Sequence, residues 1–186
     1  MANRRWAEKD FEEKMTPYID QVYKDIWGDK LISIKRNDRA NSSDKLMFMD
    51  INLAIDTHLT FANGSVLTFQ EKSRRNNYIN YDDFTFEYYN DPKTKEEGEW
   101  FKLAAQIYFY GYASEQEDGY SKYYIINIPK LRTRLMNVYD IKEMEQRFLK
   151  PNRPPAKANF FAIPFNILKK FGDVVMYESK SKVLVC

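Results

Sequence analysis

The sequence predicts an α/β fold in which helices flank a mixed central β-sheet. Two observations predict it: helical and strand-like patterns follow one another along the chain, and a strong β-hairpin pattern occupies residues 45–75. The 186 residues suit one domain, 1–186, and are too few to divide comfortably into two. Because 44% of the residues are hydrophobic and 16% aromatic, disordered and coiled-coil proteins are excluded.

The N-terminal region has the pattern of a helix followed by a short strand. Residues 7–26 place an apolar stripe near helical spacing, and Pro17 inside this range predicts a kink or two shorter helices. A strand at 31–35 and a polar loop at 36–44 come next. The residues of the stripe are Phe11, Met15, Ile19, Val22 and Ile26.

The hairpin pattern consists of two β-rich runs around Ala62-Asn63-Gly64. On the first run, 45–61, apolar and polar residues alternate, which leaves Asp56 on the polar face. A three-residue loop with glycine in the left-handed conformation places Asp56 opposite Gln70, and Lys72 then lies on the same face. A two-residue Asn-Gly turn would shift this pairing by one residue, so the register stays open.

The residues after the hairpin contain the remaining strands and helices of the expected sheet. In chain order the patterns predict a strand at 83–89, a helix at 96–113, a strand at 123–128, a helical region at 130–149, a proline-rich loop at 151–157, a strand at 160–163, a short helix at 166–171, and edge strands at 174–177 and 183–185.

Charge is distributed unevenly along the chain. Residues 1–119 hold 16 Lys and Arg against 22 Asp and Glu, whereas residues 120–186 hold 13 against 5. A basic C-terminal third suits attraction to nucleic-acid phosphates, although a solvated basic face without a partner explains it equally well. The candidate phosphate contacts are Arg74 and Arg75, which follow the hairpin, and Lys130, Arg132 and Arg134.

The polar face of the hairpin carries the residue types that phosphodiester hydrolysis needs. Asp56 and Gln70 offer oxygen ligands of the kind that Mg²⁺ prefers, and Lys72 can orient a water or stabilise charge on the phosphate. An ordinary cross-strand ion pair between Asp56 and Lys72 is the alternative. Strand alternation directs Glu71 to the opposite face, and Asp50 would lie roughly 20 Å upstream along an extended strand.

Asp56, thirteen intervening residues and then Gln70-Glu71-Lys72 resemble the Asp…(Asp/Glu)-X-Lys signature of PD-(D/E)XK nucleases. Glu12 and Glu13 resemble the supporting acidic position on the first helix of that superfamily. Gln106-Ile107-Tyr108-Phe109-Tyr110 is similar to the Gln-X-X-X-Tyr motif of its RecB-like branch, which on a helix would place Gln106 and Tyr110 on one face. The alternative explanation for this pair is core packing within Leu103, Ile107 and Tyr110 on a helix.

The resemblance covers about residues 7–130 and leaves a basic C-terminal extension at 131–186. It implies a restriction-endonuclease-like fold, a Mg²⁺ or Mn²⁺ cofactor held by Asp56 and Gln70, and a catalytic Lys72 acting on double- or single-stranded DNA. Gln70 stands where an acidic ligand is usual, as it does in Mrr-like restriction enzymes. Because the chain is small and rich in Lys and Tyr, it suits a phage or mobile-element protein.

Two other functions agree with the same residues. One is a nucleic-acid-binding or accessory protein that keeps the fold but has lost metal binding through Gln70, and the other is a partner-binding protein. No run approaches the roughly 18 apolar residues of a membrane span, and the only cysteine, Cys186, excludes a disulfide framework within one chain. We expect a cytoplasmic protein without membrane association, and a homo-oligomer stays open.

Overall fold

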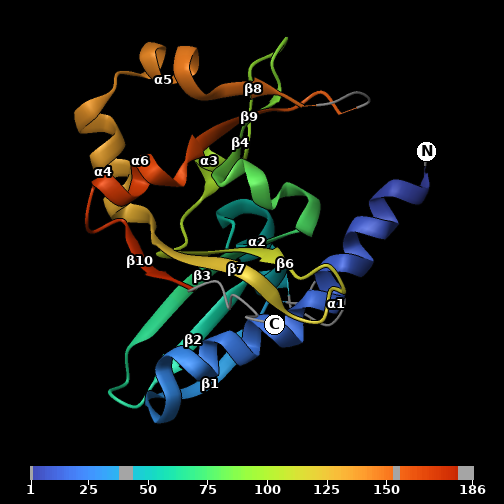
Figure 1. Ribbon diagram of the computed structural model, residues 1–186, viewed down its shortest axis with the longest axis vertical. Helices are drawn as coiled ribbons and strands as arrows, with labels where there is room; N and C mark the ends of the chain where they lie inside the picture. Colours follow the sequence, from blue (N-terminus) through green and yellow to red (C-terminus); the bar gives the residue numbers. More distant parts are fainter. Residues whose placement is uncertain (1, 38–43, 153–155, 180–186) are drawn as a thin grey trace, which may run out of the picture.

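The computed structural model describes residues 2–37, 44–152 and 156–179. It contains two β-sheets with helices around them, and the elements follow the chain from α1 at the N-terminus to β10 (Figure 1). Within these residues no helix combines the length and the apolar character that crossing a membrane requires.

The larger sheet is mixed and has six strands in the order β1-β2-β3-β6-β7-β10. Its neighbouring strands are antiparallel except for β3 and β6, which are parallel. The predicted mixed sheet flanked by helices is therefore confirmed. The bounds of its strands are Leu31–Arg36 for β1, Thr57–Phe61 for β2, Val66–Arg74 for β3, Ile107–Ala113 for β6, Tyr120–Asn127 for β7 and Val175–Glu178 for β10.

The smaller sheet has four strands in the order β5-β4-β9-β8, and all its pairs are antiparallel. The strand predicted at 83–89 forms β4 of this second sheet, where Phe84 pairs with Ile163. Its partner β9 comes from the C-terminal third of the chain, so this third is part of the second sheet. The strands are Asp83–Asp91 for β4, Glu96–Glu97 for β5, Leu149–Pro151 for β8 and Asn159–Pro164 for β9.

The two faces of the six-stranded sheet are buried against different layers. Helix α1 (Ala2–Trp27) packs Ile19 and Tyr23 against Phe69 and Phe109 on one face. On the other face, the tyrosines of β6 pack against β4, β9 and the C-terminal helices. These helices are α4 (Ile128–Val138), α5 (Ile141–Phe148) and α6 (Phe165–Lys170).

Helix α1 confirms the predicted N-terminal helix, with one difference. It is a continuous helix in which Pro17 lies inside, so two shorter helices do not form. Phe11, Met15, Ile19 and Val22 are all buried, and this stripe runs past the proline. Packing of the apolar stripe therefore holds the helix together where proline removes a backbone donor.

The hairpin register is confirmed. Thr57 pairs with Phe69 and Thr60 with Val66, which is the pairing that a three-residue loop requires. Gly64 has φ 82°, the left-handed conformation that a side chain would oppose. The N–H of Phe61 donates to the carbonyl oxygen of Ser65 at 2.9 Å and closes the loop.

The first strand of the hairpin is shorter than predicted. Residues Asp44–Leu53 form helix α2, and only Thr57–Phe61 form β2, so the strand predicted over 45–53 is wrong. The run Leu-Met-Phe-Met is apolar without a period, and such a run fits a helix as well as a strand. Leu and Met have high helix propensities, which explains why this run forms a helix although its apolar residues also suit a strand.

The helix predicted over 96–113 is also wrong. This segment contains β5, one turn of helix α3 (Glu99–Lys102), and strand β6. Every residue of β6 is buried, because α1 covers one face and the second sheet covers the other. Burial on both faces removes the alternation that marks a strand, while Ile, Tyr and Phe favour the strand conformation.

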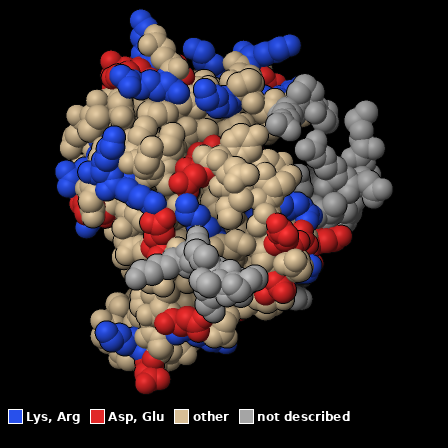
Figure 2. Space-filling model, viewed as in Figure 1, with Lys and Arg blue, Asp and Glu red and all other residues tan. Residues whose placement is uncertain are grey.

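The C-terminal elements agree with the sequence. The helical region at 130–149 consists of α4 and α5, whose first turns are capped by the side chains of Asn127 and Asp140. The edge strand predicted at 174–177 is β10, which pairs with β7. The strand predicted at 183–185 lies outside the described residues. Figure 2 shows Lys and Arg over the upper part of this face, where Figure 1 places α5 and β8, with Asp and Glu among them.

Candidate functional site

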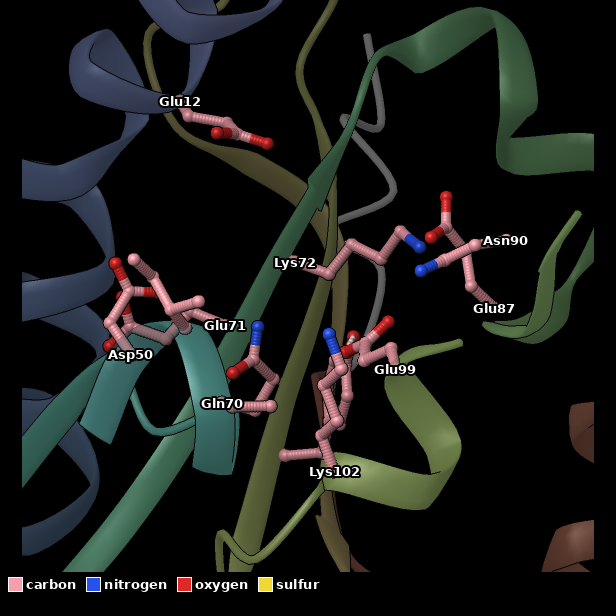
Figure 3. Close-up of a pocket in the computed structure, with 12 residues that line it drawn as sticks. Glu12, Asp50, Gln70, Glu71, Lys72, Glu87, Asn90, Glu99 and Lys102 are labelled. Atoms are coloured by element: carbon pink, nitrogen blue, oxygen red, sulfur yellow. Dashed lines mark hydrogen bonds between the residues drawn. The ribbon is translucent and has the colours of Figure 1, made fainter. Parts of the chain in front are cut away.

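A hollow of about 500 Å³ lies between the two sheets and is lined from α1, α2, β3, β4, α3 and β6 (Figure 3). We call it the inter-sheet hollow. Besides Glu71, its lining includes four residues with carboxylate side chains and two lysines, so its net charge is negative. Its charged and amide residues are Glu12, Asp50, Gln70, Glu71, Lys72, Glu87, Asn90, Glu99 and Lys102.

Gln70 and Lys72 enter the hollow from the same face of β3. The parallel pairing of β3 with β6 places Gln70 beside Tyr108 and Lys72 beside Tyr110. The Oε1 atom of Gln70 is buried and has no hydrogen-bond partner. A buried amide oxygen without a partner is unfavourable, and it is a position where a ligand or a metal ion would be accommodated.

Among the described residues, Lys72 Nζ makes one long contact. Its Nζ lies 3.5 Å from the carbonyl oxygen of Thr85 on β4, at the outer limit of a hydrogen bond. Figure 3 shows the ammonium group directed toward Glu87 and Asn90. The lysine therefore spans the hollow from one sheet to the other.

Asp56 lies just before β2 and is fixed beside β3. Its Oδ2 accepts a hydrogen bond from the N–H of Glu71 at 2.9 Å, and its own N–H donates to the carbonyl oxygen of Phe69 at 2.8 Å. Burial raises the pKa of Asp56 well above its usual range, and the negative charges of Glu71, Asp50 and Glu99 raise it further. A cation beside Asp56 would relieve both effects.

Glu71 occupies the opposite side of β3, as strand alternation predicts. Its carboxylate accepts hydrogen bonds from the hydroxyl of Tyr23, at 2.8 Å, and from the guanidinium of Arg36. Only 8% of the side chain is exposed. Because its carboxylate oxygens are engaged on the α1 side, Glu71 supplies its backbone N–H to Asp56 rather than a carboxylate ligand.

The acidic residues of the first two helices lie differently from the sequence-based expectation. Asp50 lines the hollow because α2 is a helix and folds back over the hairpin, whereas an extended strand would have carried it away. Glu12 lines the hollow from α1, and Glu13 is exposed and does not. In Figure 3 Glu12 stands apart from the group formed by Gln70 and Lys102.

Gln106 and Tyr110 do not share a helical face, since this segment is a strand. Gln106 is exposed, and its Oε1 accepts from the N–H of Thr68 at 3.2 Å. Tyr110 is fully buried, and its hydroxyl lies 2.9 Å from both Thr85 Oγ1 and Arg74 Nη1. Both residues join strands, and neither lines the inter-sheet hollow.

Several residues of the hollow could not be predicted from local sequence patterns. Glu99 accepts a hydrogen bond from the hydroxyl of Tyr108 at 2.8 Å, and burial together with Glu99 raises the pKa of that tyrosine. Glu87 and Lys102 complete the walls. The pattern of 96–113 predicts a helix and gives no sign that Glu99 and Lys102 on α3 face the hollow, and Glu87 reaches it from β4 of the second sheet.

The candidate phosphate contacts near the hairpin have partners within the protein. Arg74 donates to Thr85 Oγ1 at 2.7 Å, and its guanidinium lies 4.3 Å from the centre of the Tyr78 ring. Arg75 forms an ion pair with Glu117 and lies over the ring of Phe11. These contacts leave less of each guanidinium for a phosphate.

The three basic residues of α4 are engaged in the same way. Asp173 pairs with Arg134 at 3.2 Å and lies 3.7 Å from Lys130. Arg132 lies over the Trp100 ring and donates to the Trp100 carbonyl oxygen. Arg134 and Lys130 are exposed, so their ion pairs with Asp173 are screened by solvent.

The oxygen donors that the resemblance implies are the carboxylate of Asp56, which does not itself line the inter-sheet hollow, and the amide oxygen of Gln70, which does. Among the residues that the structure describes, no three His, Cys, Asp or Glu side chains converge to hold a metal. One carboxylate and one amide oxygen remain, and Mg²⁺ is commonly bound by one or two protein carboxylates together with waters and substrate phosphate. The unpartnered Oε1 of Gln70 and the raised pKa of Asp56 both agree with this.

Comparison with known proteins adds no relative. Neither a family model, nor a curated protein, nor a solved structure matches this chain.

Proposed function

We propose that the protein is a Mg²⁺- or Mn²⁺-dependent deoxyribonuclease of restriction-endonuclease-like fold. The observation that carries the proposal is the Oε1 of Gln70, which is buried without a partner on the same strand face as Lys72. The hairpin register places Asp56 beside this strand, as the resemblance to PD-(D/E)XK nucleases requires. The mixed sheet with helices on its faces agrees with that fold.

Each of the three residues has a separate task in the proposed reaction. Asp56 and Gln70 would hold the ion, which polarises the phosphate and lowers the pKa of the attacking water. Lys72 carries a positive charge on a long side chain with one long contact, so it can turn toward a phosphate in the hollow. There its ammonium group would stabilise the charge that develops on the phosphate oxygens.

The charge of the hollow explains why metal dependence should be strict. Apart from Glu71, whose carboxylate is paired with Arg36, four carboxylates line it against two ammonium groups, and a phosphodiester is itself an anion. Without a cation, repulsion would oppose entry of the substrate. We therefore expect DNA cleavage by the wild type to depend on an added divalent ion and to stop in EDTA.

The proposal is tested by incubating the protein with linear, circular and single-stranded DNA in Mg²⁺ or Mn²⁺. Cleavage by the wild type that is lost in Lys72→Ala and Asp56→Ala supports it, whereas cleavage retained in Lys72→Ala refutes the site. Lys150→Ala removes an exposed lysine from β8 and is the matched control. Degradation of linear DNA alone indicates an exonuclease, and nicking of circles an endonuclease.

A second candidate is a protein of the same fold that binds nucleic acid without cutting it. The specific observation in its favour is that no three acidic or histidine side chains converge among the described residues. Calorimetric titration with Mn²⁺ separates the two functions. Binding by the wild type that is lost in Asp56→Ala favours the nuclease, and no binding, together with retained DNA affinity, favours the second candidate.

A further inference from the structure

Asn37 is a buried polar residue at the end of β1, next to the candidate site. Only 6% of it is exposed. Its Nδ2 donates to the carbonyl oxygen of Ile55 at 2.6 Å, and its backbone N–H donates to the carbonyl oxygen of Asp56 at 2.7 Å. One residue thus binds two successive carbonyl groups of the segment that presents Asp56.

This segment needs external support because of its backbone conformation. Ala54 has φ 45°, a left-handed conformation that is unfavourable for a residue with a side chain. It lies where the chain leaves α2 and enters β2, and Asp56 follows two residues later. A strained connection persists when neighbouring groups hold it, and Asn37 supplies two of the hydrogen bonds that do so.

Asp56 is also held from the other strand. Its N–H donates to Phe69, and its Oδ2 accepts from the N–H of Glu71, both on β3. The backbone of Asp56 is thereby fixed between β1 and β3, while one of its two carboxylate oxygens is already oriented by the Glu71 amide. A metal ligand has to be placed to within about 0.5 Å, and a carboxylate on an unsupported connection would not be.

We infer that Asn37 is a positioning residue for Asp56, which it acts on through the backbone of Ile55 and Asp56 without touching the substrate. Only the expected effect on metal binding and DNA cleavage rests on the proposed function. The geometry of the Asp56 segment can be measured independently of any reaction.

The test uses Asn37→Ala and the nearly isosteric Asn37→Leu, which keeps the volume if the alanine variant fails to fold. Both retain the backbone N–H and lose the Nδ2 donor. Asn76→Ala is the matched control, because Asn76 Nδ2 donates to the Ala113 carbonyl oxygen at 3.0 Å, away from the hollow. Three quantities are measured: amide hydrogen exchange at Glu71, Mn²⁺ affinity, and kcat and KM for DNA cleavage.

We expect exchange of the Glu71 amide to quicken by about tenfold or more in the Asn37 variants as the Asp56 carboxylate moves away. Mn²⁺ affinity or kcat should fall by about 10- to 100-fold, the usual effect of removing a group that orients a ligand, with KM nearly unchanged. Asn76→Ala should alter none of these quantities by more than about twofold, because its hydrogen bond lies outside the site.

The outcomes separate this inference from the proposed function. Exchange at Glu71 that stays at the wild-type rate in both Asn37 variants overturns the inference, and so does an equal loss of kcat in Asn76→Ala. If the wild type neither binds Mn²⁺ nor cleaves DNA, the proposed function fails. Faster exchange at Glu71 in the Asn37 variants alone would then still establish the positioning role.

Discussion

The ion pair between Arg36 and Glu71 offers the sharpest test of how the hairpin is held. Arg36 on β1 binds Glu71 on β3 and Asp20 on α1, and its Nη1 lies 3.1 Å from Thr57 Oγ1 on β2. Tyr23 donates to the same glutamate. One guanidinium therefore joins a helix and three strands directly behind the candidate site.

Replacing Arg36 by methionine removes the charge and keeps much of the volume. Glu71, with 8% of its side chain exposed, would then keep Tyr23 as a partner but lose its counter-ion. Breaking a buried pair by removing one partner costs about 3–5 kcal/mol, because the remaining charge is left uncompensated. For a chain of this length that loss corresponds to a decrease in Tm of roughly 6–20 °C.

The assay is urea denaturation at pH 7, followed by far-UV circular dichroism, for wild type, Arg36→Met, Glu71→Leu and the double variant. Replacing both partners by apolar residues is often neutral or stabilising, so the double variant should recover at least about half of the loss in Arg36→Met. A loss below about 1 kcal/mol in Arg36→Met, the range of an exposed ion pair, would refute the reasoning. So would a double variant no more stable than Arg36→Met.

Three further predictions concern the site and its walls. Tyr110→Phe leaves Thr85 Oγ1 and its neighbours one hydrogen bond short and should lower the free energy of unfolding by about 1–3 kcal/mol in the same assay. The folded-state pKa of Asp56 is raised, so its ionised form destabilises the metal-free protein at neutral pH. Asp56→Asn should therefore be more stable than wild type at pH 7 in EDTA. This gain in stability should disappear as the pH falls to about 4, where the carboxyl group is protonated in the folded and the unfolded chain. A Cβ on Gly98 would lie 2.7 Å from the backbone oxygen of Glu87, so Gly98→Ala should cost about 1–3 kcal/mol in urea, whereas an unchanged midpoint would show that α3 can shift freely.

The hairpin register could be predicted because its determinants are local. Gly64 at the left-handed position fixes the loop length, and the loop length fixes which residues face each other across the strands. The pairing of Thr57 with Phe69 follows from the turn alone. The relation of Asp56 to Gln70 and Lys72 could therefore be inferred from about twenty consecutive residues.

The strand β6 could not be predicted, because its character depends on what covers it. Tyr108 and Phe109 point to opposite faces, and both faces are buried, one by the second sheet and the other by α1. A single sequence does not show whether an apolar run is buried on both faces of a sheet or inside a helix bundle. For this reason the prediction that Gln106 and Tyr110 share a helical face is wrong.

The residues that form the walls of the inter-sheet hollow could not be predicted from the sequence, for a different reason. Glu87 and Glu99 meet Gln70 only because a second sheet folds over the first, and that contact joins segments with no common local pattern. The residues that share β3 with Lys72 or lie beside it in the hairpin can be predicted from local patterns. The residues that face Lys72 from the second sheet cannot.

The pairing of β4 with β9 has a consequence for how the protein is made. Phe84 on β4 pairs with Ile163 on β9, which is almost eighty residues later in the chain, so this edge of β4 has no partner until β9 has been synthesised. Such a closure is slow, since a long stretch of chain must be ordered before the contact forms. As the chain leaves the ribosome, β4, which carries Glu87 and Asn90, would be synthesised long before its partner β9. The unfinished intermediate would expose β4 as a bare edge rich in aromatic residues, so a nascent chain stalled before β9 would be prone to aggregate.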